Sequence, residues 1–156
     1  MSWPEPGWTS VQPFPFTAAR SAFAGMTDDR DKVVLRYYKR GDGALVATAA
    51  FGPRAEGAPG LVHGGATLTA LDEALGAAAW VAGMPCLTVR LETEFRRGLP
   101  VGAACLVTTH VERMRHGLAD VAGELAGEDG TVYARALGRF KRLSPEAMKA
   151  MFGRTL

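Results

Sequence analysis

The segment from Gly64 to Ala82 constrains the fold of this 156-residue chain more than any other. Its larger apolar residues recur at steps of three and four, and alanine fills most remaining positions, which predicts a helix that ends before Gly83. The only charged residues in this segment are Asp72 and Glu73. Because such a helix is apolar on nearly every side, we expect it to lie in the centre of the fold with another element wrapped around it.

Six segments with β-forming composition flank this helix and supply that wrapping element. They span residues 32–38, 44–51, 87–97, 103–114, 118–126 and 131–143. The breaks between consecutive segments are too short for parallel crossovers but permit antiparallel hairpins. In 87–97 apolar and charged residues alternate, so we expect the central helix to cover the apolar face formed by Leu87, Val89, Leu91 and Phe95. The prediction is an α+β fold in which an antiparallel sheet of about six strands wraps around one long helix.

Composition limits the domain boundaries, the cellular location and the classes of partner that we expect for this chain. We expect an irregular leader over 1–30 packed on a domain over 31–143, followed by a short C-terminal helix or tail over 144–156. No secretory signal and no membrane-spanning stretch is evident, and the net charge of +2 comes without a basic run for nucleic acid. The two cysteines show no metal or disulfide spacing. These features predict a cytoplasmic protein with neither membrane nor nucleic-acid partners.

The start of the predicted helix has the features of an oxyanion site. Gly64 and Gly65 follow His63 and lead directly into the apolar segment. Amide groups in the first turn of a helix lack intrahelical partners, and the helix dipole favours negative charge there. These amides can therefore stabilise the tetrahedral state formed when a carbonyl is attacked, although the two glycines can equally serve close packing of helix on sheet.

Asp72 is the candidate catalytic carboxylate. A charged group in the middle of an apolar helix is costly unless it is paired or functional, and it can act here as a general base or as a nucleophile. Asp72 and Gly64 are eight residues apart, which separates them by about 12 Å along one helix. One carbonyl cannot contact both. If the two act together, one of them must come from a second copy of the chain, in a two-fold dimer with shared sites.

Three sequence segments resemble the PaaI-like branch of the hotdog-fold thioesterases: His-Gly-Gly at 63–65, Leu-Asp-Glu-Ala-Leu-Gly at 71–76, and Leu-Thr-Val-Arg-Leu-Glu-Thr-Glu-Phe at 87–95. The likeness extends over roughly 44–143. It implies a hotdog fold and hydrolysis of an aryl or fatty acyl-CoA thioester to acid and thiol, without metal or cofactor. It also implies that the Gly64 amide contacts the thioester oxygen, that Asp72 comes from the facing subunit, and that homodimers pair into tetramers.

The resemblance assigns further roles around the site. Thr88 matches a threonine that helps to place the attacking water, yet strand alternation puts it on the polar face, so the strand needs a bend at its start. The resemblance also implies that His63 shapes the glycine turn. Independently of the resemblance, Glu73 lies about a quarter-turn from Asp72 on the helix, and we expect it to be a charge at the rim of the substrate site or at an interface. Four basic residues are candidates for binding CoA: Arg96, Arg97, Lys141 and Arg142.

Other chemistries fit the sequence less well. Cys105 and His110 are five positions apart on one predicted strand and so face opposite ways, which disfavours a Cys/His dyad. The three histidines show no metal-ligand spacing. Hotdog dehydratases place a histidine and an acid differently from this chain. A hotdog domain that binds acyl-CoA or acyl-carrier protein without turnover stays open, because fold alone does not define function.

Overall fold

The computed structural model describes residues 2–15 and 23–153, and its central feature is one long helix against one curved sheet. The helix α1 spans Gly64–Val81, and a second helix, α2, spans Pro145–Phe152. The strands are β1 (Thr9–Val11), β2 (Ala24–Gly25), β3 (Val33–Lys39), β4 (Leu45–Phe51), β5 (Cys86–Phe95), β6 (Ala104–Arg115), β7 (Leu118–Gly127) and β8 (Val132–Arg142), with a 3-10 turn, η1, at Pro53–Ala55.

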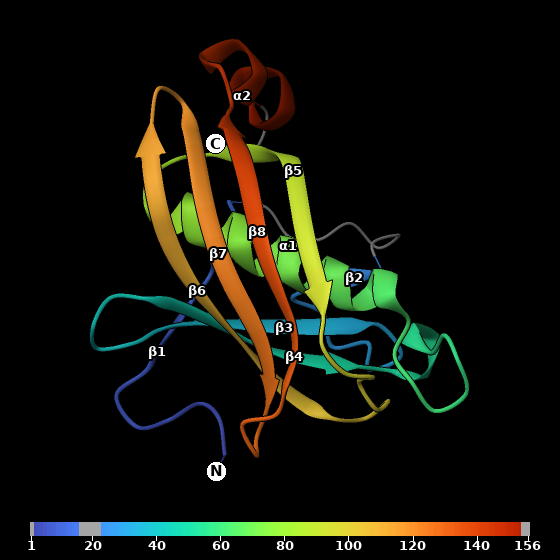
Figure 1. Cartoon of the computed structure of the whole chain (residues 1–156). Helices are drawn as coiled ribbons and strands as arrows, with labels where there is room; N and C mark the ends of the chain where they lie inside the picture. Colours follow the sequence, from blue (N-terminus) through green and yellow to red (C-terminus); the bar gives the residue numbers. More distant parts are fainter. Residues whose placement is uncertain (1, 16–22, 154–156) are drawn as a thin grey trace.

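The strands form a single sheet in the order β1-β3-β4-β6-β7-β8-β5, with β2 paired to β3. All pairs are antiparallel except β2 with β3. Figure 1 shows α1 lying across one face of this sheet and α2 beside the end where β8 finishes. The predicted α+β arrangement is confirmed. No helix in the described part of the chain has both the length and the hydrophobicity needed to cross a bilayer.

Over the described residues the sheet has eight strands, because the leader adds β1 and β2 to its edge, where the sequence predicted irregular structure. With three and two residues, these strands are too short to show a period-two pattern. At the other end of the chain, the hydroxyl of Ser144 accepts a hydrogen bond from the Ala147 amide at 3.0 Å and caps α2. Pro145 occupies the first turn, in the pattern expected from the sequence.

Two glycines in the sheet let it approach the central helix closely. A Cβ at Gly123 would lie 2.5 Å from Cδ1 of Leu75, which is fully buried on α1. A Cβ at Gly138 would lie 2.6 Å from Cε2 of Phe140, another core residue. Both distances are shorter than any contact that real side chains make. The sheet therefore closes around the leucine side chain because it carries no side chains at these two points.

β5 departs from the predicted pattern because it is an edge strand with a bulge. Leu87 and Val89 are 51% and 55% exposed, so the expectation that α1 covers them is wrong. The register with β8 pairs Thr88 with Phe140 and then skips to Arg90, which leaves Val89 as the extra residue. Since directly opposed residues share a face and Phe140 is buried, Thr88 lies on the helix side of the sheet.

We predict that Gly123→Ala lowers the free energy of unfolding by about 1–3 kcal/mol, because a well-packed core does not accept an added methyl group. That methyl would also lie 3.1 Å from the backbone oxygen of Thr108, so movement of Leu75 alone would not relieve the crowding. Urea unfolding measures the change. Gly41→Ala is the control, since its methyl would meet nothing within 4 Å. Equal midpoints for the two variants would contradict the packing argument.

Candidate active site

Asp72 and Thr88 are brought together by the bulge in β5. The Thr88 hydroxyl donates a hydrogen bond to Asp72 Oδ1 at 2.7 Å, across the gap between β5 and α1. The carboxylate is half-buried, and the hydrogen bond from Thr88 fixes its orientation. Its second oxygen is not used by this bond, and the threonine oxygen keeps its lone pairs as acceptors. The pair can therefore hold a water molecule between a base and a second acceptor.

At the start of α1, the His63 side chain engages the amide of Gly65. Nδ1 of His63 accepts this hydrogen bond at 2.8 Å, and the His63 carbonyl accepts from the amides of Ala66 and Thr67 at 2.9 and 3.1 Å. Among the described residues, none accepts a hydrogen bond from the amide of Gly64, which is exposed. The sequence predicted the amides of both glycines as donors. Of these two amides, only that of Gly64 is available to a ligand in the structure, because the Gly65 amide already donates to His63.

The reasons for glycine differ at these two positions. A Cβ at Gly65 would lie 3.0 Å from Nδ1 of His63, so a larger residue there would crowd the capping histidine. A Cβ at Gly64 would meet only the ring of Phe95, at 3.6 Å, which is an ordinary contact. The packing of this chain alone therefore does not demand glycine at position 64. Close approach of something from outside the chain would explain it.

The amide and the carboxylate open into two separate pockets. The pocket at the start of α1, termed the donor pocket, has a volume of about 440 Å³ and is lined by His63, Gly64, Phe95, Arg96, Arg97 and Tyr133 among others. The pocket beside Asp72, termed the acid pocket, has a volume of about 220 Å³ and includes Glu73, Thr88, Trp80 and Phe152 in its lining. Thr88 and Phe95 place the two pockets near opposite ends of β5.

The four candidate basic residues divide between these two ends. Arg96 and Arg97 line the donor pocket. Lys141 and Arg142 lie opposite Leu87 and Cys86 in the β5–β8 ladder, and so at the end of the sheet where the acid pocket lies. All four side chains are exposed. Within one chain the structure therefore does not bring them together.

Glu73 and Asp72 both line the acid pocket, so two carboxylates lie close together there. Burial raises the pKa of Glu73 to about 6, and the neighbouring charge of Asp72 adds to the shift. Tyr37 is buried nearby, and its pKa is also raised, first by burial and then by the charges of Glu73 and Asp72. Glu73, predicted from the sequence to be a charge at the rim of the site or at an interface, lies in the lining of the acid pocket.

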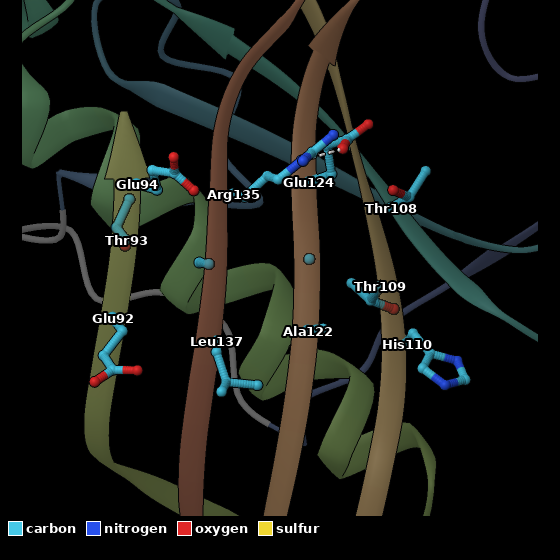
Figure 2. Close-up of a pocket in the computed structure, with 12 residues that line it drawn as sticks. Glu92, Thr93, Glu94, Thr108, Thr109, His110, Ala122, Glu124, Arg135 and Leu137 are labelled. Carbon is cyan, nitrogen blue, oxygen red and sulfur yellow. Dashed lines mark hydrogen bonds and ion pairs between the residues drawn. The ribbon is translucent and has the colours of Figure 1, made fainter. Parts of the chain in front are cut away.

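A larger depression of about 620 Å³ lies on the opposite face of the sheet, across β5, β8, β7 and β6 (Figure 2). Glu124 and Arg135 point toward each other there and form an ion pair at 2.8 Å. His110 belongs to this face, whereas Cys105 is buried, and burial raises the pKa of its thiol to about 12. None of the site residues predicted from the sequence lines this depression. Within the described ranges no three His, Cys, Asp or Glu side chains cluster as a metal site requires.

Comparison with solved structures identifies the architecture as the hotdog fold. The structure of a thioesterase superfamily protein matches with a TM-score of 0.64 at 27% identity, covering 69% of this chain and 53% of the other. The Escherichia coli PaaI protein from the phenylacetic acid degradation operon matches with a TM-score of 0.61, covering 65% and 73%. At 18% identity this second likeness concerns the fold alone.

The sequence comparison identifies similarity to one family. Residues 59–134 match the family model of the thioesterase superfamily. A mouse relative, acyl-coenzyme A thioesterase THEM5, is 33% identical over 96 residues, which are 61% of this chain and 39% of the relative. The chain thus corresponds to about two fifths of that relative's length. The matched region includes the start of α1, Asp72 and Thr88.

We predict that Glu73→Gln changes how stability depends on pH. The pKa of about 6 exceeds the ordinary 4.5, so between these values the folded protein binds more protons than the unfolded chain, and stability falls as pH rises. Above pH 6 the charged side chain costs about 1–2 kcal/mol, which glutamine removes.

Urea unfolding at a fixed protein concentration tests this at about pH 7.5 and about pH 4.5. The variant is expected to be more stable than the unmodified protein at the higher pH, with the gap narrowing at the lower. The same replacement at the exposed Glu112 is the control. A gap that is constant with pH would show that titration of Glu73 is not its cause.

Proposed function

We propose that this protein is an acyl-CoA thioesterase whose active site is shared between two subunits. Asp72 of one subunit acts as the base, and the Gly64 amide of the other binds the thioester oxygen. The match to the thioesterase superfamily model and the similarity to an acyl-coenzyme A thioesterase support this class of reaction. The observation that carries the proposal is the separation of the amide and the carboxylate into two pockets.

Neither pocket is sufficient for the chemistry. Gly64 and Asp72 are separated by about 12 Å along α1, whereas a base and an oxyanion donor must each come within about 3 Å of the reacting group. None of the described residues that line the donor pocket carries a carboxylate, and Gly64 with its free amide is not among the described residues that line the acid pocket. A second copy of the chain can supply the missing half in each case.

β5 provides the surface that can join the two copies. Among the described strands it pairs only with β8, and it exposes apolar side chains along its length. Such an open edge favours pairing with another strand. Antiparallel pairing of β5 with β5 of a second copy places the start of one strand opposite the end of the other. Thr88 then lies near the partner's Phe95, so each acid pocket meets a donor pocket, twice per dimer.

Hydrolysis follows from these groups without a further catalyst. Asp72 removes a proton from a water held with Thr88, and the water oxygen attacks the thioester carbon. The carbonyl oxygen becomes negative and is stabilised by the partner's Gly64 amide at the positive end of α1. When the carbon–sulfur bond breaks, the thiolate leaves readily because thiols have a pKa of about 8.5. Protonated Asp72 then gives up its proton, which neutralises the thiolate, and the products are the free acid and CoA.

The basic residues support CoA as the thiol component. Arg96 and Arg97 line the donor pocket, where guanidinium groups can bind phosphate. In the antiparallel dimer, the end of β5 beside these arginines adjoins the partner's end that carries Lys141 and Arg142. We therefore place all four residues around one entrance, formed by two subunits. Pairing of such dimers into a tetramer remains our expectation from the family resemblance.

Asp72→Asn is expected to lower kcat by about 10²–10⁴, because the amide cannot accept the proton from water. The assay follows thiol release from a panel of acyl-CoAs. Binding of the same acyl-CoA, measured by calorimetry, should be retained in the variant. If the unmodified protein binds acyl-CoAs but releases no thiol from any of them, it is a binding module and the enzymatic proposal is wrong.

Gly64→Pro removes the proposed donor with little change to the helix. Position 64 is the first residue of α1, where proline is favoured, and His63 before it has the extended conformation that proline requires. Gly64→Ala is the matched control, because it adds a side chain but keeps the amide. We expect kcat to fall about 10²–10³ further in the proline variant than in the alanine variant.

Mixing two inactive variants tests the shared site directly. In heterodimers of Asp72→Asn and Gly64→Pro subunits, one site has both defects and the other has neither. Random exchange of equal amounts should restore about a quarter of the activity of the unmodified protein. If mixing restores no activity although subunits exchange, the two groups act within one chain and the shared-site mechanism is excluded.

A further inference from the structure

The acid pocket extends past Asp72 into an apolar compartment closed by aromatic rings. Resting on the proposed function, we infer that this compartment binds the acyl group and that Trp80 forms its end wall. The enzyme would then act on compact apolar acyl groups, namely short or medium chains and single rings, and discriminate against long fatty chains. The leader and α2 would thereby take part in substrate selection.

One face of α1 forms the floor of the pocket. Asp72, Gly76 and Trp80 follow one another at intervals of four residues and all line the pocket. Residues with this spacing lie on the same helix face, so the floor runs about 12 Å from the carboxylate to the indole. In the middle, Gly76 has no side chain, and a Cβ there would lie 3.3 Å from the ring of Phe140, which also lines the pocket. A methyl group at this position would therefore crowd the Phe140 ring and reduce the space between Asp72 and Trp80.

The end wall is held in place by contacts between three elements. The indole nitrogen of Trp80 donates a hydrogen bond to the carbonyl oxygen of Cys86 at 3.1 Å. Its ring meets Phe14 of the leader edge-on at 5.7 Å between centroids, and Phe152 of α2 edge-on at 6.0 Å. Such edge-to-face contacts favour one ring arrangement over others. Trp80 is therefore fixed as a boundary and is not free to swing aside.

The dimensions of the pocket limit the acyl group. A cavity of about 150 Å³ lined by apolar side chains is large enough to bind benzene. At about 220 Å³, the acid pocket offers room for one ring with a short link to the carbonyl, or for an aliphatic chain of similar bulk. Its polar groups gather at the Asp72 end, where the carbonyl would lie, while the lining near Trp80 is aromatic and aliphatic. Polarity and size thus point to the same orientation.

Two of the walls come from outside the segment that matches the thioesterase family. Phe14 precedes residues 59–134, and Met151 and Phe152 follow them. These walls therefore belong to parts of the chain that the family match does not describe. This is why the substrate preference should be a property of this chain rather than of the fold.

The test compares kcat/KM over a series of straight-chain acyl-CoAs from acetyl to palmitoyl, together with benzoyl-CoA. For the unmodified protein we expect a decrease of about tenfold or more at the first chain that exceeds the pocket. Trp80→Leu should move this decrease to longer chains by deepening the pocket. Gly76→Ala should move it to shorter chains by narrowing the floor. Circular dichroism and urea unfolding establish that both variants are folded.

Opposite shifts in the two variants would support the inference, because a general loss of stability would lower activity with every substrate alike. If both variants lower kcat/KM equally at all chain lengths, or if the unmodified protein prefers palmitoyl-CoA, the compartment does not select the acyl group. Should Trp80→Leu fail to fold, Met151→Ala at the exposed rim of the same wall replaces it, with the same expected direction. Absence of thiol release from every acyl-CoA would instead refute the proposed function itself.

Discussion

The burial of an almost uncharged helix that nevertheless carries a carboxylate is the constraint on which the rest of this structure depends. The sheet must curve around α1 to cover its apolar surface, and Gly123 and Gly138 make the close approach possible. Asp72 cannot be placed against the middle of that sheet without losing its hydration. It lies instead on the flank facing the edge strand, where the Thr88 hydroxyl satisfies one carboxylate oxygen and a pocket reaches the other side.

The same edge strand relates the two halves of the site. β5 begins beside the carboxylate and ends beside the free amide of Gly64, so its two ends present complementary parts of one reaction. An edge strand offers unpaired backbone groups, and here it also exposes apolar side chains. The surface that would join two copies of the chain is therefore also the one that would complete the chemistry, which couples assembly to activity in the mechanism we propose.

Prediction from the sequence succeeded where a residue's environment is set by near neighbours along the chain. The length and burial of α1 and the long antiparallel strands followed from periodicity. Strand alternation placed Thr88 on the polar face unless the strand bends, and the bulge at Val89 supplies that change. The leader strands could not be predicted, because two or three residues carry no periodic signal. Nor could the exposure of Leu87, since alternation does not reveal that a strand lies at the edge of its sheet.

By itself the sequence determined the helix, the spacing of Gly64 and Asp72, and from that spacing the need for a second subunit if the two act together. The tertiary structure alone decided that the His63 side chain accepts a hydrogen bond from the Gly65 amide. It also decided that the rings of Phe14 and Phe152 both pack against Trp80. The physical reason is the range of the interactions. Helical rise relates residues a few positions apart whatever surrounds them, whereas contacts between distant segments depend on strand order and on the face that each side chain takes.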